Sequence, residues 1–149
     1  MRSGSSRIKV LFLCTGNSAR SQIAEGFAHK FGEGFIEPHS AGFAPQGINP
    51  KAVAVMKELE IDISNQKSKA IDEESLMEMD VIITLCGDAE ESCPLTPPQI
   101  KRFHWPIKDP AKATGTDEEI MKEFRSARDE IKKRVIKFVE EVKDGKRIS

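Results

Sequence analysis

Four short apolar segments alternate with segments of helical spacing along the chain. The first, IKVLFL at 8–13, is an unbroken apolar run, which is typical of a strand buried on both faces of a sheet. A second strong run, DVIITLC at 80–86, is rich in β-branched residues and ends in a cysteine. The weaker segments 35–41 and 100–107, the latter terminated by Pro106, complete a set of four predicted strands.

The segments between these strands have the periodicity of helices. In 49–60, Asn49 is a typical N-cap and Pro50 suits the first helical position, so a helix is predicted there. The short acidic segment 72–79 is predicted to be another helix. In 19–31, apolar side chains recur every four residues and therefore share one helix face: Ile23, Phe27 and Phe31.

The last segment has the clearest helical pattern, with Thr116 or Asp117 as its cap. Its apolar stripe consists of Ile120, Phe124, Ala127, Ile131, Val135, Phe138 and Val142. Charged residues between them are expected to form a solvated face: Lys122, Glu123, Arg128, Asp129, Lys132 and Lys133. Strands alternating with helices predict an α/β domain in which helices cover a parallel sheet, and such sheets bind ligands at the carboxyl ends of their strands.

Composition narrows the class of protein. The 149 residues fit one domain, residues 1–149, with 1–7 as a flexible tail. A net charge of -1 argues against a general nucleic-acid or membrane-surface binder, and no apolar stretch approaches a membrane span. The first residues lack the apolar core of a signal peptide, and three cysteines do not suggest a secreted disulfide framework. We therefore expect a cytoplasmic protein.

Candidate chemistry is concentrated directly after the first strand, in the sequence CTGNSARS. Cys14 ends the strand, and Arg20 follows six residues later at the start of a predicted helix. Arg20 offers a guanidinium fork that matches a tetrahedral oxyanion, and the same positive field favours a Cys14 thiolate, which is a nucleophile. The residues between them are small or polar, so their backbone N–H groups can turn toward a bound anion: Thr15, Gly16, Asn17, Ser18 and Ala19. The alternative is a buried structural cysteine beside an unrelated surface arginine.

From about Ile8 to the last helix, the sequence resembles the thioredoxin-coupled arsenate reductases. The resemblance rests on three segments, CTGNSARSQIAEG, VIITLCGDAEESCP and HWPIKDPA. These proteins share their fold and anion loop with the low-molecular-weight protein tyrosine phosphatases. The resemblance implies a three-layer fold with a four-stranded parallel sheet in the order 2-1-3-4, and no metal or organic cofactor.

The resemblance also implies a relay of three thiols that reduces arsenate to arsenite. Arsenate would lie in the loop after the first strand, with Ser21 holding the Cys14 thiolate and Asp109 acting as the general acid. Cys86 would attack Cys14, and Cys93 would attack Cys86, so that thioredoxin receives a Cys86–Cys93 disulfide. Phosphate and sulfate would compete for the loop. A glutaredoxin-type reductant stays an alternative to thioredoxin, and a monomer is expected.

Strand order and spacing bear on whether these thiols can meet. If strands one and three are neighbours, as that order implies, Cys14 and Cys86 lie at strand ends roughly 5 Å apart in the sheet direction. A helix between Cys86 and Cys93 would separate their Cα atoms by about 10 Å, whereas a disulfide tolerates roughly 4.4–6.8 Å. Pairing them therefore requires the segment 87–92 to unwind. Two ordinary buried thiols are the alternative; a zinc site lacks any Cys-x-x-Cys or paired-histidine spacing.

Two other functions stay open on the sequence. A low-molecular-weight phosphatase would hydrolyse phosphotyrosine or small phosphoesters through a Cys14 phosphoenzyme. Such enzymes usually carry an aromatic residue after the Asp-Pro pair, whereas here 111–113 read AKA and the chain has no tyrosine. A non-enzymatic redox sensor would use the thiols but leaves Arg20 and Asp109 unexplained. Without the resemblance, an Asp-Pro pair is usually only a turn.

Some arsenate reductases of this kind bind potassium beside the anion loop, and the matching side chains here are Asn17, Glu25, Ser40 and Lys69. The lysine stands where a carboxylate is expected. We predict that the Lys69 ammonium replaces the cation and pairs with Glu25, bracing Asn17 from within. His104 and Trp105 are interpreted as packing residues. His29 and His39 are isolated histidines and receive no role.

Overall fold

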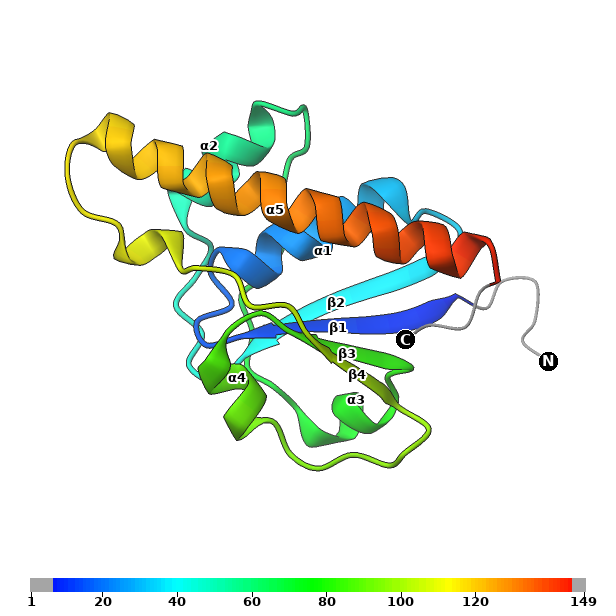
Figure 1. Cartoon of the computed structure of the whole chain (residues 1–149). Coiled ribbons are helices and arrows are strands. Elements are labelled where there is room, and N and C mark those ends of the chain that lie inside the picture. The colour runs from blue at the N-terminus through cyan, green and yellow to red at the C-terminus, as the bar shows by residue number, and fades with distance from the viewer. Residues whose placement is uncertain (1–6, 146–149) are drawn as a thin grey trace.

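The chain folds around a parallel sheet whose strands follow the order β2-β1-β3-β4 (Figure 1). The computed structural model describes residues 7–145 apart from the side chains of Asp88 and Glu90, so most of the predicted tail at 1–7 lies outside the described residues. The predicted fold class and strand order are confirmed. The strands are β1 (Ile8–Cys14), β2 (Ile36–Gly42), β3 (Val81–Thr84) and β4 (Lys101–His104).

Helices lie on both sides of this sheet. Figure 1 shows α1, α2 and α5 on one side and α3 and α4 on the other. No helix in the described part of the chain is long and apolar enough to cross a membrane. The helices are α1 (Arg20–Phe31), α2 (Pro50–Lys57), α3 (Glu73–Met77), α4 (Gly87–Ser92), α5 (Asp117–Lys143) and the 3-10 helix η1 (Pro110–Lys112).

The apolar run of β1 forms the centre of the core. It pairs with β2 on one side and β3 on the other, and helices cover both faces, so its residues 10–13 are all buried. Ile23 and Phe27 of α1 and Ile131 of α5 pack into the same core. The double burial explains why this strand has no polar alternation.

Several element ends differ from the predicted ones. The helix predicted over 49–60 ends at Lys57, because the chain reverses through Glu60 at a φ of +61°. Asn49 caps it as expected, accepting from the N–H of Lys51 at 2.8 Å. The strand predicted over 100–107 pairs only over Lys101–His104.

The cap of α5 is Thr116 rather than Asp117. Thr116 and Glu119 form a reciprocal capping box, which satisfies two otherwise unpaired N–H groups. One residue assigned to the solvated face is not solvated: Arg128 is buried and donates to the Val55 carbonyl at 2.9 Å and to Glu58 at 2.7 Å. That prediction was wrong because α2 packs over this part of α5 and supplies the acceptors.

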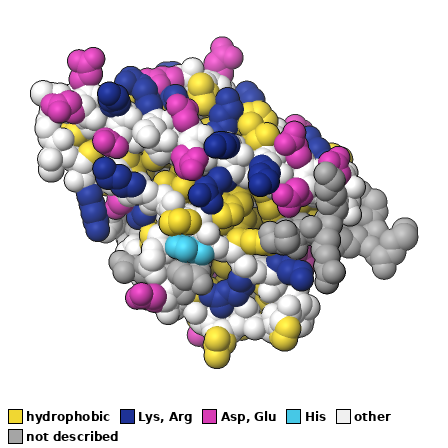
Figure 2. Space-filling model, viewed as in Figure 1, with side chains coloured by type: hydrophobic (Ala, Val, Ile, Leu, Met, Phe, Trp, Pro, Cys, Tyr) yellow, Lys and Arg dark blue, Asp and Glu magenta, His cyan; other side chains and the backbone are white. Residues whose placement is uncertain are grey.

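The packing interpretation of His104 and Trp105 holds for Trp105 only. Trp105 packs with Phe12 and Phe138, with ring centroids 6.2 and 6.1 Å apart. His104 is exposed instead, and its Nδ1 lies 2.9 Å from the Thr84 hydroxyl. Figure 2 shows basic and acidic side chains interspersed on this face of the molecule, in keeping with the small net charge.

Candidate functional site

A pocket of about 910 Å³ opens at the carboxyl ends of β1 and β3. It brings together Cys14 and Arg20 of one loop with Cys86 and Asp109, so three separate parts of the sequence meet there. Loop residues after β1 form its base, and its outer wall comes from the segments around α2 and η1. The lining residues are Cys14, Thr15, Gly16, Ser18, Ala19, Arg20, Gln46, Asn49, Cys86, Gly87, Lys108, Asp109, Ala111, Lys112, Ala113, Thr114, Glu119 and Glu123.

The backbone of the loop 14–20 is arranged for an anion. Its carbonyl groups turn away from the pocket: those of Thr15, Gly16 and Ser18 accept from the N–H groups of Ala44, Gln46 and Asn49 at 2.9–3.0 Å. The N–H groups of residues 15–19 donate to no other group in the described part of the chain. The N-terminus of α1 also has no capping side chain and no acidic residue in its first turn. Free N–H groups at a helix N-terminus form a cradle for an oxyanion.

Asn17 shapes this cradle. It is fully buried, and its backbone takes a left-handed φ of +44°, a conformation that asparagine tolerates better than most residues. Its side-chain Nδ2 donates to the Ser21 hydroxyl oxygen at 2.8 Å, and its side-chain Oδ1 accepts from the backbone N–H of Lys69 at 2.9 Å.

Cys14 and Ser21 lie in direct contact. Their Sγ and Oγ atoms are 2.9 Å apart, and both side chains are buried. Because the Ser21 oxygen already accepts from Asn17, its own hydrogen is free to point at the sulfur. A hydroxyl donor aimed at a sulfur stabilises the thiolate form, which is the form that acts as a nucleophile.

Arg20 and Asp109 face each other across the pocket. Arg20 donates to the Ile107 carbonyl at 2.9 Å, and its second terminal nitrogen lies 3.5 Å from an Asp109 carboxylate oxygen. The other Asp109 oxygen caps η1 by accepting from the N–H of Ala111 at 3.0 Å. The Asp-Pro turn thus aims a carboxyl group at the anion loop.

Cys86 and Cys93 lie at the two ends of α4. The Cys86 sulfur caps the helix, 3.4 Å from the N–H of Ala89, and it also lies 3.4 Å from the Thr15 hydroxyl oxygen in the anion loop. Cys93 ends the helix, and its N–H donates to the Ala89 carbonyl. None of these three cysteines is in a disulfide, and all three are buried. Because the segment between Cys86 and Cys93 is helical, a disulfide between them requires α4 to unwind.

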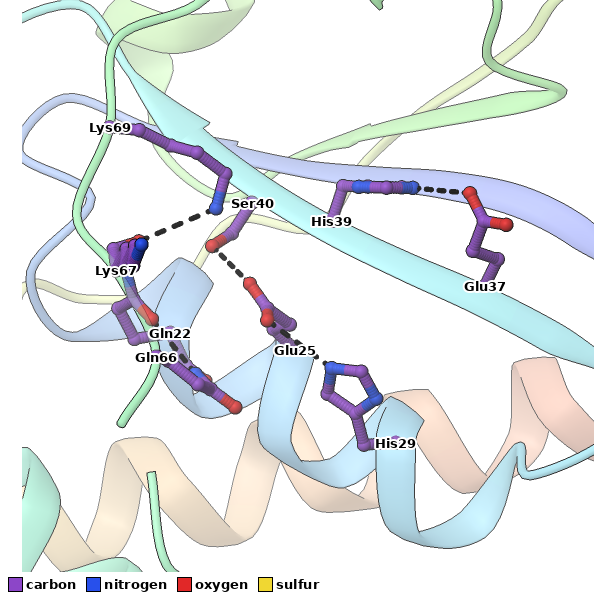
Figure 3. A network of polar contacts seen from close by, with 9 residues as sticks. All are labelled: Gln22, Glu25, His29, Glu37, His39, Ser40, Gln66, Lys67 and Lys69. Atoms are coloured by element: carbon purple, nitrogen blue, oxygen red, sulfur yellow. Dashed lines mark hydrogen bonds and ion pairs between the residues drawn. The ribbon is translucent and has the colours of Figure 1, made fainter. Parts of the chain in front are cut away.

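The bracing side chains differ in one respect from the prediction (Figure 3). The Lys69 ammonium forms no ion pair with Glu25; it donates to the Lys67 carbonyl at 3.4 Å, and Lys69 reaches Asn17 through its backbone N–H. Glu25 instead accepts from Ser40 at 2.5 Å and lies 3.3 Å from a ring nitrogen of His29, a residue given no role from sequence. The predicted pair does not form: the Lys69 side chain turns to the Lys67 carbonyl, and Glu25 binds Ser40 and His29.

Burial and hydrogen bonding oppose each other at Glu25. Burial acts to raise its pKa, but the hydrogen bonds from His29 and Ser40 and the positive charge of Lys69 outweigh it, so the pKa lies below the usual value. Glu25 is therefore a carboxylate at neutral pH. No group of three or more His, Cys, Asp or Glu residues within the described ranges could hold a metal ion.

Sequence reasoning missed Gln22, which is fully buried beside the loop. Its amide nitrogen donates to the carbonyls of Asn17 and Lys67 at 3.1 and 3.0 Å. The only available signal was a polar residue within the buried stretch of a predicted helix. Its partner at Lys67 lies 45 positions away, so local patterns could not supply it.

Comparison with known proteins agrees with this geometry. The family model for low molecular weight phosphotyrosine protein phosphatases matches residues 9–147. An arsenate reductase of Bacillus subtilis (strain 168) is 51% identical over 131 residues, which are 88% of this chain and 94% of that protein.

Solved structures that are similar to this chain include an arsenate reductase and a phosphatase of this family. One described as an arsenate reductase in the phosphate binding state is 35% identical, with a TM-score of 0.74, and the match covers 91% of this chain and 98% of that one. A low molecular weight protein tyrosine phosphatase from T. tengcongensis is 25% identical, with a TM-score of 0.73, over 90% and 99% of the two chains. The chain therefore belongs to the low molecular weight phosphotyrosine protein phosphatase family and, within it, is similar to arsenate reductases.

Proposed function

We propose that this protein reduces arsenate to arsenite through Cys14, Cys86 and Cys93, and that a thioredoxin-type dithiol protein regenerates it. The observation that carries the proposal is the second thiol in the pocket: Cys86 lines it together with Cys14 and contacts Thr15 of the anion loop. Hydrolysis of a phosphoester through a Cys14 phosphoenzyme needs no second thiol. The similarity to proteins named arsenate reductase supports the same assignment.

The first step uses the anion loop. Arsenate binds to the free N–H groups of the loop and to Arg20. The Arg20 guanidinium, which lies beside Asp109 in the pocket, then donates hydrogen bonds to the ligand. The Cys14 thiolate attacks arsenic, a sulfur–arsenic bond forms, and one arsenic–oxygen bond breaks. Asp109 gives a proton to the departing oxygen, which leaves as water.

The second step transfers electrons to arsenic. A Cys86 thiolate attacks the Cys14 sulfur, so a disulfide forms and the electron pair of the sulfur–arsenic bond stays on arsenic, which leaves as arsenite. Cys93 then attacks the Cys86 sulfur, which releases the Cys14 thiolate and forms the Cys86–Cys93 disulfide. An external dithiol reduces this disulfide and is oxidised in turn.

We also propose that the relay runs without a metal or organic cofactor, in the cytoplasm and in a monomer. The thiols supply every electron that the reduction needs. The positive charge of Lys69 lowers the pKa of Glu25, and it takes the place of the potassium ion that relatives of this kind hold beside the loop. A thioredoxin-type partner suits an intramolecular disulfide better than a glutaredoxin-type one, because dithiol exchange returns both cysteines to thiols. Phosphate and sulfate are expected to compete with arsenate.

A phosphatase is the second candidate, favoured by the loop itself, which would hold phosphate as readily as arsenate. Among the described residues that line the pocket, however, none is aromatic, so nothing stacks on a phosphotyrosine ring. We expect slow hydrolysis of small aryl phosphates at most. A non-enzymatic redox sensor accounts for neither Arg20 nor Asp109.

The deciding experiment follows NADPH consumption with arsenate, thioredoxin and thioredoxin reductase in the parent protein and in Cys93→Ser. We expect repeated turnover in the parent and one cycle or less in the variant, because Cys93 is needed to release Cys14. No arsenate-dependent consumption, together with aryl phosphate hydrolysis that survives Cys93→Ser, would instead identify a phosphatase.

A further inference from the structure

The segment 66–71, here called the strap, binds the anion loop and the end of β2 from outside the core. The Ser68 hydroxyl donates to the Gly16 carbonyl at 3.3 Å, and the Lys69 N–H donates to the Asn17 side chain at 2.9 Å. The strap also pairs with Gly42 in both directions: the Gly42 N–H donates to the Lys69 carbonyl, and the Ile71 N–H donates to the Gly42 carbonyl, each at 2.9 Å. The strap is therefore tied to both the loop and the sheet.

Gln22 joins the strap to the loop from inside. Its amide nitrogen donates to the backbone carbonyl of Asn17 and to that of Lys67. Its side-chain oxygen accepts from the Gln66 amide at 2.8 Å, and Gln66 also donates to the Gln22 backbone carbonyl at 3.0 Å (Figure 3). Gln22 has no exposed surface, so water cannot take the place of any of these hydrogen bonds if it is lost.

These contacts decide which way the Asn17 amide faces. Its oxygen is held by the Lys69 N–H, so its nitrogen faces Ser21, and the Ser21 hydrogen is left for Cys14. If the strap moved away, the Asn17 amide could rotate and present its oxygen to Ser21. The Ser21 hydroxyl would then donate to Asn17 instead of the Cys14 sulfur, and the thiolate would lose its donor.

We propose that Gln22 is a positioning residue for the nucleophile: it holds the strap against the anion loop and thereby keeps the Ser21 hydroxyl directed at Cys14. This inference rests on the proposed role of Cys14 as the nucleophile. Gln22 also supports the left-handed backbone of Asn17, since it binds the carbonyl of that residue. Gln22 touches neither the pocket nor the sulfur, so it acts only through Asn17 and Ser21.

The test measures the rate of Cys14 alkylation by iodoacetamide between pH 5 and 9, in a Cys86→Ser/Cys93→Ser background where Cys14 is the single thiol. Gln22→Leu keeps the side-chain volume but removes its donors and acceptor. We expect alkylation at neutral pH to slow roughly fivefold to tenfold, the scale of one ordinary lost hydrogen bond, and its midpoint to move to higher pH. Asn65→Leu makes the same chemical change next to the strap, at an exposed side chain, and is expected to match the parent.

A superimposable pH profile for Gln22→Leu and the parent would overturn the proposal, even if the variant melts at a lower temperature. Should Gln22→Leu not fold, Gln66→Leu provides the same test from the half-buried strap side, with the same expected slowing and the same contrary result. Neither measurement uses arsenate or thioredoxin. A failure of the proposed arsenate reduction would therefore leave the alkylation result standing, and the two proposals can fail separately.

Discussion

At the scale of single residues, the chemistry depends on short-range hydrogen bonds between buried side chains. Cys14, Ser21 and Asn17 form a chain in which each contact is 2.8–2.9 Å long. Because these side chains are shielded from water, the direction of each hydrogen matters more than it would at a surface. The protein itself thus fixes the hydrogen-bond donors around the Cys14 sulfur.

Replacing Ser21 by alanine should impair the first chemical step while leaving the fold intact. The Cys14 sulfur loses its donor, so we expect arsenate turnover at pH 7 to fall roughly tenfold to a hundredfold, the scale of removing one preorganised donor. Steady-state kinetics would measure this. Ser64→Ala, at an exposed serine in another turn, serves as the control. Equal turnover in Ser21→Ala and the parent would contradict the role given to Ser21.

Gly42 should tolerate no side chain. A Cβ there would lie 2.6 Å from the Thr15 carbonyl oxygen, 2.8 Å from the Asn17 nitrogen and 2.9 Å from the Cys14 carbonyl oxygen. All three are backbone atoms, so the anion loop itself would have to shift. We expect Gly42→Ala to lower the free energy of unfolding by about 1–3 kcal/mol and to weaken phosphate binding.

Thermal unfolding with and without phosphate would measure both effects. Gly87→Ala is the stability control, because a Cβ at Gly87 meets no atom within 4 Å. A Gly42→Ala protein with the parent's melting temperature and the parent's stabilisation by phosphate would show that the loop can move without cost.

At the scale of elements, α4 is the part of the fold that must change during the proposed cycle. It is short, and it is held at its start by the Cys86 sulfur and at its end by the Cys93 N–H. A six-residue helix gains little stability from its own hydrogen bonds, so breaking it costs little. This element is suited to unwinding, whereas its neighbour β3 pairs on both sides.

Forming the Cys86–Cys93 disulfide should therefore remove the hydrogen bonds of α4. We expect the backbone N–H groups of Ala89 and Cys93 to exchange with solvent faster in the oxidised protein, since their acceptors are Cys86 and Ala89. The N–H of Leu85, which donates to Leu13 of β1, should keep its protection. Hydrogen exchange followed by NMR would test this. Equal exchange of Cys93 in both redox forms would mean that α4 stays helical.

At the scale of the whole molecule, Glu25 connects parts that are distant in the sequence. It lies on α1, accepts from Ser40 of β2 and contacts His29 one turn further along its own helix. Its pKa lies below the usual value in the folded protein, so the unfolded chain binds a proton there more readily. Its contribution to stability is therefore present above about pH 4.5 and is lost as the pH falls through the lowered pKa.

Glu25→Gln should reduce the free energy of unfolding at pH 7 by about 1 kcal/mol, and the difference from the parent should shrink below pH 4.5. Urea unfolding at several pH values would measure it. The exposed Glu33, changed in the same way, should have no such effect. A constant difference between Glu25→Gln and the parent across this range would show that the charge of Glu25 contributes nothing.

The sequence by itself determined the features that depend on local pattern. The apolar runs marked the strands, Asn49 and Thr116 marked helix starts, and the spacing from Cys14 to Arg20 marked the anion loop. These features follow from backbone geometry and from side chains a few positions apart, which a single sequence displays.

Only the tertiary structure decided the partners that come from distant segments. Gln22 meets Lys67, Glu25 meets Ser40 of β2, and Arg128 is buried because α2 supplies its acceptors. Buried polar groups take whichever partners packing brings within about 3 Å, and packing is a property of the whole chain. For this reason the strands and the loop between Cys14 and Arg20 could be predicted from sequence, whereas the contacts that Gln22 makes with distant segments could not.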